Sequence, residues 1–181
     1  MLVFLDFEAS SLARHSYPIE VAWVFEDGAS EAHLIRPAPG WDDWDARAEA
    51  IHRIPRETLA EGVAHDFVAQ RMFEQLAGHD LTASAPSWDG KWLSTLLRAA
   101  GLPRHALRLR DSDDAQRETA RAILRETVPA DRLEAEVERI IIQTMTARSG
   151  QITAHRALAD ALEEHARWRA VRDAAAQFRD A

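Results

Sequence analysis

The stretch that decides the fold is Leu2-Val3-Phe4-Leu5-Asp6-Phe7-Glu8-Ala9-Ser10-Ser11-Leu12, an apolar run that carries two carboxylates one residue apart. Side chains alternate between the faces of a strand, so Asp6 and Glu8 project from one face and Phe7 from the other. Neighbouring carboxylates repel each other, and a hard cation such as Mg²⁺ or Mn²⁺ relieves that repulsion. We interpret the pair as half of a metal site.

Around this strand, apolar alternation and turn signals predict a three-stranded antiparallel β-meander, followed by helices that alternate with two short strands. The predicted strands are 2–7, 18–25, 31–36, 80–85 and 107–111, and the predicted helices are 43–51, 55–60, 65–77, 88–100, 113–127, 131–147 and 156–178. This order is typical of a mixed α/β sandwich, and we expect one domain over residues 1–181.

The composition favours a cytoplasmic protein that does not enter a membrane. The chain has 181 residues, 46% of them apolar, which is enough for one buried core. It has no Cys, which excludes disulfides and thiolate metal sites and fits a reducing compartment. No apolar run approaches the roughly 20 residues of a membrane span. The net charge of −8 argues against tight coating of a duplex and favours transient binding to a strand end.

Further acidic residues must complete a metal site, because two ions need more oxygen ligands than one pair of carboxylates supplies. Asp89 begins a predicted helix after a short strand, where it either points over the sheet edge or stabilises the helix N-terminus. His155 and Asp160 are five positions apart, about 140° on a helix, so both face one site only if His155 precedes the helix. In that arrangement His155 is a proton-transfer group and Asp160 is a metal ligand beside it. The alternative is that His155 is a helix-entry residue and Asp160 a solvated charge.

The pattern Asp6-x-Glu8, Asp89 and His155-x-x-x-x-Asp160 resembles the DEDDh family of 3′–5′ exonucleases, which includes ribonuclease T, oligoribonuclease and proofreading exonucleases. The resemblance covers about residues 2–165. It implies an RNase H-like mixed sheet flanked by helices and two Mg²⁺ or Mn²⁺ ions held by the four carboxylates. It also implies that His155 is the general base, which takes the proton of the attacking water.

The loops around the site depart from the family pattern. Ile51-His52-Arg53-Ile54 resembles the family's Ile-His-Gly-Ile, but Arg53 lacks the φ freedom of the usual glycine. Ser84 stands where the family commonly has Asn, and Pro86 stiffens the same loop. We therefore expect a family-type metal site with altered substrate handling.

The resemblance implies hydrolysis of single-stranded DNA, RNA or short oligonucleotides from the 3′ end, with release of nucleoside 5′-monophosphates. Family members are often dimers, so a homodimer is a further expectation. The predicted substrate-binding residues are Phe7, Ala9, Ser10, Ser11, Leu12, His52, Ser84 and Trp88. For Phe7 and Trp88, core packing is favoured over base stacking. The alternatives are a non-catalytic nucleic-acid- or partner-binding module on this fold, and a phosphodiesterase for small nucleotides.

Basic residues offer weaker candidates for phosphate contacts. Arg104, Arg108 and Arg110 cluster near the last predicted strand, but acidic residues follow at once, so a solvated mixed-charge face is the favoured interpretation. Lys91 and Arg156 lie next to motif residues and are better placed for a backbone phosphate.

Overall fold

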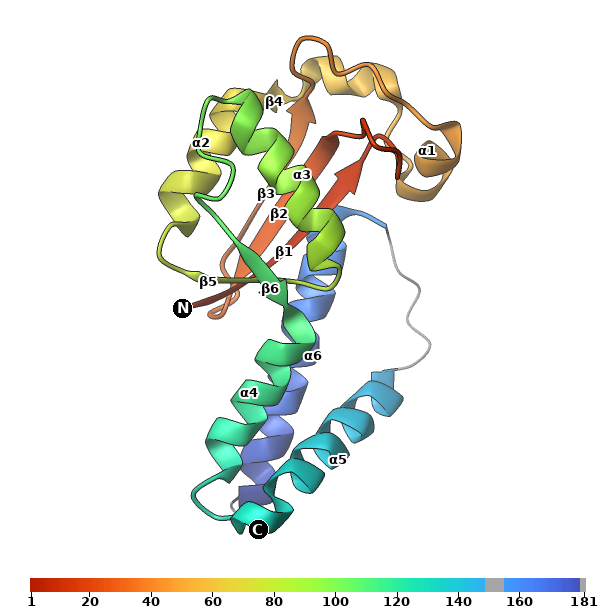
Figure 1. Ribbon diagram of the computed structural model, residues 1–181. Coiled ribbons are helices and arrows are strands. Elements are labelled where there is room, and N and C mark those ends of the chain that lie inside the picture. Colours follow the sequence, from red (N-terminus) through yellow and green to blue (C-terminus); the bar gives the residue numbers. More distant parts are fainter. Residues whose placement is uncertain (149–154, 180–181) are drawn as a thin grey trace.

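A computed structural model describes residues 1–148 and 155–179 of the chain. Within these residues, a mixed sheet has the strand order β4-β3-β2-β1-β5-β6 (Figure 1). The strands are β1 (Leu2–Ala9), β2 (Pro18–Phe25), β3 (Ser30–Arg36), β4 (Val63–Ala64), β5 (Asp80–Ala83) and β6 (Leu109–Asp111). The first three form an antiparallel meander, while β5 and β6 extend the sheet in parallel beside β1. The predicted mixed α/β architecture is confirmed.

Helices flank the sheet and continue beyond it (Figure 1). They are α1 (Ala46–His52), the short 3₁₀ helix η1 (Arg56–Glu61), α2 (His65–Leu76), α3 (Pro86–Ala99), α4 (Ser112–Leu124), α5 (Ala130–Arg148) and α6 (Ala157–Arg179). Each predicted helix is present with somewhat shifted ends. The largest shift at a helix start is at α1, which begins at Ala46 because the Asp45 side chain accepts the Arg47 N–H and caps the helix there. Strand β4 was not predicted.

The alternation along β1 separates two apolar layers. Val3, Leu5 and Phe7 belong to the main core cluster, which also contains buried residues of α2 and α3. Phe4 points to the opposite face, where it packs with Trp168 of α6. The favoured interpretation of Phe7 as a core residue is confirmed, since only 4% of its surface is exposed. Asp6 and Glu8 follow Phe4 in register and therefore face α6.

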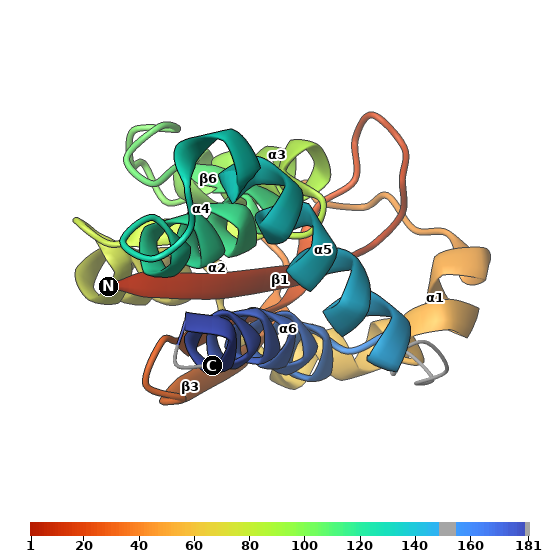
Figure 2. The same cartoon turned by 90° about the horizontal axis from the view of Figure 1, so that it is seen from below.

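Helix α6 covers this face of the sheet, because it packs on both β1 and β2 (Figure 2). Its C-terminal half leaves the sheet and packs with α4 and α5 around a second apolar cluster. Ile140 and Ile141 are buried there, whereas Ile142 is 61% exposed. The run Ile140-Ile141-Ile142, which could have formed the interface of the expected homodimer, is thus mainly internal. Within the described residues, no helix is long and apolar enough to cross a membrane.

Candidate active site

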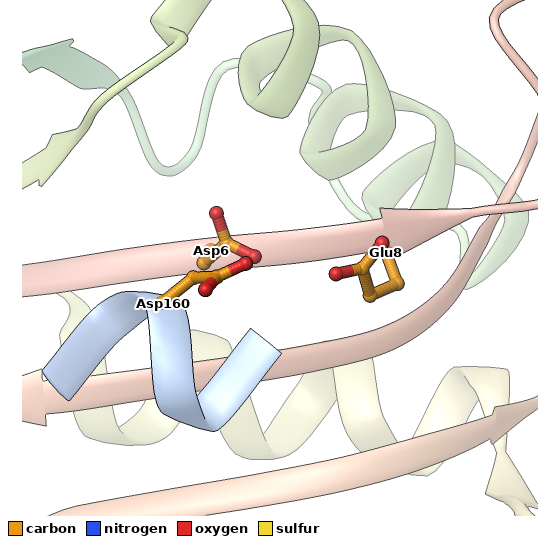
Figure 3. A group of neighbouring side chains, drawn as sticks. All are labelled: Asp6, Glu8 and Asp160. Carbon is orange, nitrogen blue, oxygen red and sulfur yellow. The ribbon is translucent and has the colours of Figure 1, made fainter. Parts of the chain in front are cut away.

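Three carboxylates from β1 and α6 meet in one place (Figure 3). Asp6, Glu8 and Asp160 each offer one oxygen, and these oxygens all lie within 4.8 Å of one another. Strand alternation puts the first two on one face, and α6 brings Asp160 over that face in its first turn. Clustered carboxylate oxygens are the ligands that Mg²⁺ and Mn²⁺ prefer, so the residues present fit a divalent ion.

The electrostatics of this cluster favour an added cation. Burial raises the pKa of Asp6 well above its ordinary value, and the charges of Asp89 and Glu8 raise it further. Burial also raises the pKa of Glu8 to about 8, and Asp160 is the second cause. The pKa of Asp160 is raised by burial as well, and its Oδ1 is buried with no hydrogen-bond partner among the described residues. The raised pKa values mean that the protonated carboxyl groups are favoured. A bound divalent ion would reverse this preference and favour the ionised forms.

Asp89 lies close to the cluster without joining it. It sits in the first turn of α3, is 2% exposed, and is not one of the three carboxylates whose oxygens converge. Burial raises its pKa to about 7, although backbone groups of Ala85 and Phe7 lower it. Its Oδ2 is buried and has no partner among the described residues. Asp89 therefore has a buried oxygen without a hydrogen-bond partner among the described residues, and its charge raises the pKa of Asp6.

His155 lies just ahead of α6, as the spacing argument required, because the helix begins at Ala157. Its side chain is exposed and its φ of 45° is in the left-handed region, which a non-glycine residue rarely adopts. The charge of a protonated His155 lowers the pKa of Asp160, which is the expected effect of two groups that lie near each other.

Glu20 holds the N-terminus of α6 against the sheet, although it was not among the predicted site residues. It lies on β2 opposite Glu8 and is 6% exposed. Its carboxylate accepts hydrogen bonds of 2.5–3.2 Å from the Arg156 guanidinium and one of 3.0 Å from the Ala157 N–H. A negative group at a helix N-terminus is stabilising. The signal in the sequence for this role was the lone carboxylate in an otherwise apolar strand. Arg156, considered above for a phosphate contact, uses its guanidinium to bind Glu20.

A pocket of about 130 Å³ opens beside Glu8. Its walls are mostly apolar and include most of the predicted substrate-binding residues. They are Phe7, Glu8, Ala9, Ser11, Leu12, Ala48, Ile51, His52 and Trp92. The rim is exposed, with Leu12 67% and Ile51 53% accessible.

His52 supplies the one buried polar ring among these walls. Its Nδ1 accepts the Ile54 N–H at 3.0 Å, so a neutral ring carries its proton on Nε2. That nitrogen is buried and has no partner among the described residues. Burial lowers the pKa of His52 and so favours the neutral form. The pocket therefore contains a hydrogen-bond donor with no acceptor from the described part of the chain.

The serines after β1 have other partners. Ser10 is fully buried, and its hydroxyl donates to Asp43 while accepting the Tyr17 N–H. The Ser11 hydroxyl donates to the same carboxylate at 2.5 Å. These hydroxyls fasten the segment before α1 to the end of β1, so Ser10 does not line the pocket.

Ser84 and Trp88 lie elsewhere around the site. Ser84 lines a separate cavity of about 180 Å³ together with Asp6, Asp160, Glu163, Glu164 and Arg167. Trp88 is 38% exposed and stacks on Trp92 with ring centroids 5.7 Å apart. The favoured interpretation of Trp88 as a core residue is wrong, because its position in the first turn of α3 leaves its ring at the surface.

Arg53 shows how the chain manages without the family glycine. It ends α1 in the left-handed conformation with a φ of 57°, and its N–H donates to the Glu49 carbonyl at 2.8 Å. The turn therefore keeps a backbone geometry that suits glycine, with an arginine in it.

No protein-family model and no curated protein matches this sequence. Solved structures do match. Exonuclease I of Methylocaldum szegediense is 22% identical with a TM-score of 0.67 over 95% of this chain and 40% of its own. Exonuclease I of E. coli in complex with a dT13 oligonucleotide is 17% identical with a TM-score of 0.67 over 99% of this chain and 42% of its own. A zinc-bound complex of the E. coli enzyme with single-stranded DNA is 17% identical with a TM-score of 0.66.

These matches show the fold. The sheet and its helices have the RNase H-like architecture of the exonucleases, as predicted. The chain spans about 40% of the length of these exonuclease I proteins.

Proposed function

We propose that this chain is a divalent-metal-dependent 3′–5′ exonuclease that acts on single-stranded nucleic acid. The observation that carries the proposal is the convergence of Asp6, Glu8 and Asp160, whose ligand oxygens lie within 4.8 Å of one another. The fold is that of exonuclease I, and relatives of that fold have been solved with single-stranded DNA.

In this proposal, Asp6, Glu8 and Asp160 would hold Mg²⁺ or Mn²⁺, and the buried free oxygen of Asp89 would contribute directly or through water. Bound there, the ions would supply Lewis-acid stabilisation of negative charge on the phosphoryl group. His155 accepts the proton of the attacking water at a ring nitrogen. This step requires a neutral imidazole. The product is a nucleoside 5′-monophosphate.

The terminal nucleotide would occupy the pocket beside Glu8. Its mostly apolar walls suit a nucleobase or sugar face, and the Nε2–H of His52 in these walls would donate to an acceptor on that nucleotide. Exposed Leu12 and Ile51 at the rim would separate the terminal base from the next one. Exposed Trp88 offers a surface on which a further base can stack.

The test uses a 5′-labelled dT20 strand with Mn²⁺, resolved on a sequencing gel. The wild-type protein should produce a stepwise ladder, and Asp6→Asn should abolish it. Glu61→Gln, which removes one exposed carboxylate far from the cluster in sequence, should leave the ladder unchanged.

Four results would defeat the proposal or select an alternative. A ladder that persists in Asp6→Asn, or no shortening by the wild type, removes the exonuclease assignment. Strand binding without shortening selects the non-catalytic module. Hydrolysis of thymidine 5′-(4-nitrophenyl phosphate) without any ladder selects a small-nucleotide phosphodiesterase.

A further inference from the structure

A basic cavity lies outside the carboxylate cluster and outside the pocket of His52. It has a volume of about 360 Å³, is open to solvent, and is lined by the middle of α3, the connection from α3 to β6 and the first residue of β6. Its polar walls are Lys91, Ser94, Arg104, His105 and Arg108. None of its lining residues is acidic, although the chain as a whole carries a net charge of −8. We call it the α3–β6 pocket.

Two of the cations in this pocket are available to a ligand. Arg104 and Arg108 form no ion pair with any described residue, and Arg104 uses one nitrogen, Nε, to donate to His105 at 2.8 Å. The third arginine of the cluster differs, because Arg110 pairs with Asp80 at 2.7 Å and with Glu118 at 2.9 Å. Arg104 and Arg108 are exposed, as expected for a solvated face, but among the described residues only Arg110 of the three pairs with opposite charge. Uncompensated guanidinium groups beside a cavity favour an anion with several oxygens.

The pocket lies close to Asp89 along α3. Its helical wall begins at Gly90, the residue after Asp89, and extends to Ser94, within about 7.5 Å of Asp89 along the helix axis. Lys91 ties this stretch of α3 to the loop that follows β1, because its Nζ donates to the Ala13 carbonyl at 2.6 Å and to the Ser16 hydroxyl at 2.8 Å. A strand whose end lies at the cluster would therefore pass near this pocket within a few nucleotides.

We propose that the α3–β6 pocket binds a backbone phosphate of the single strand, upstream of the nucleotide that is cleaved. This inference rests on the proposed exonuclease function and adds to it a second contact point, formed by Arg104 and Arg108. A guanidinium pair clamps a phosphodiester through charge-assisted hydrogen bonds without reading the base. The consequence is a dependence on chain length, because a mononucleotide diester does not reach the pocket.

The test compares R104Q/R108Q with R36Q/R125Q, a control that removes the same two charges from exposed arginines outside the pocket. Binding of 5′-fluorescein dT12 is followed by anisotropy in EDTA, so the measurement does not depend on cleavage. Loss of this one phosphate contact should weaken binding about 5-fold at 0.1 M salt and make the slope of log K against log salt shallower by about 0.7. The control variant should match the wild type in slope.

Hydrolysis of thymidine 5′-(4-nitrophenyl phosphate) with Mn²⁺ should be equal in the wild type and R104Q/R108Q, because that substrate ends before the pocket. Equal dT12 affinity and slope in both variants, or no dT12 binding by the wild type, would overturn the proposal. So would displacement of dT12 by millimolar inorganic phosphate at constant ionic strength, which would assign the pocket to the free ion. Loss of dT12 binding in R104Q/R108Q, together with no cleavage by the wild type, would keep the pocket and remove the exonuclease function.

Discussion

Replacing Glu8 by Gln should stabilise the metal-free protein at pH 8 and leave its stability nearly unchanged at pH 4. Burial, followed by the charge of Asp160, raises the pKa of Glu8 from 4.5 to about 8. Between these two pH values the folded protein keeps a proton that the unfolded chain has released. The free energy of unfolding therefore falls as the pH rises through this window. The contribution of Glu8 to stability is fully present only below about pH 4.5. Gln is uncharged and avoids this loss.

The magnitude follows from the shift. One pKa unit corresponds to about 1.4 kcal/mol, so a shift from 4.5 to about 8 gives at most about 5 kcal/mol above the folded-state pKa. At pH 8 half of the folded molecules have lost the proton, which reduces the expected gain for Glu8→Gln to about 4 kcal/mol. Against a typical total of roughly 5–15 kcal/mol, this gain should be easy to measure.

The assay is urea unfolding followed by tryptophan fluorescence in EDTA, from pH 4 to pH 8. Glu61→Gln is the matched control, because it removes an exposed carboxylate of the same kind in η1. The stability difference between Glu8→Gln and the wild type should grow with pH, while that of the control stays flat. A Glu8→Gln protein that is equally stable or less stable than the wild type at pH 8 would refute the argument that this carboxylate is strained by burial and repulsion.

Three further predictions concern the supports of the site. Mn²⁺ should raise the urea midpoint of the wild type and raise it much less in Asp160→Asn, and calorimetry should show the same loss of binding heat. Glu20→Ala should lower the free energy of unfolding by about 2–4 kcal/mol, since Arg156 and the Ala157 N–H then lose the buried carboxylate that accepts their hydrogen bonds. Glu20→Gln should cost less because its amide oxygen still accepts the N–H. Arg53→Gly should stabilise the protein by about 0.5–1 kcal/mol, as glycine adopts a φ of 57° without strain.

Each of these predictions has an opposing outcome. An equal midpoint shift in Asp160→Asn would remove this residue from the ion site. Equal costs for the two Glu20 variants would mean that the Ala157 hydrogen bond contributes nothing. A destabilised Arg53→Gly protein in thermal or urea unfolding would show that the arginine side chain makes contacts that outweigh the backbone strain.

Local sequence determined the elements because their signals lie between near neighbours. Apolar alternation predicted β2 at its observed ends, and helical periodicity with caps predicted each helix to within a few residues. Strand β4 was missed because it is two residues long and exists only by pairing with Ile35 and Arg36 on β3. A strand defined by a distant partner carries no pattern of its own.

The same division applies to the site. Alternation alone put Asp6 and Glu8 on one face, and angular spacing alone required His155 to precede its helix. Tertiary packing of α6 on β1 brought Asp160 to them, and packing of α3 left Asp89 buried just outside the converging oxygens. The roles of Glu20 at the start of α6, of exposed Trp88 and of the uncompensated arginines of the α3–β6 pocket also came only from the structure. The physical reason is that strand and helix geometry relate residues a few positions apart, whereas distances and burial between remote segments depend on how whole elements pack.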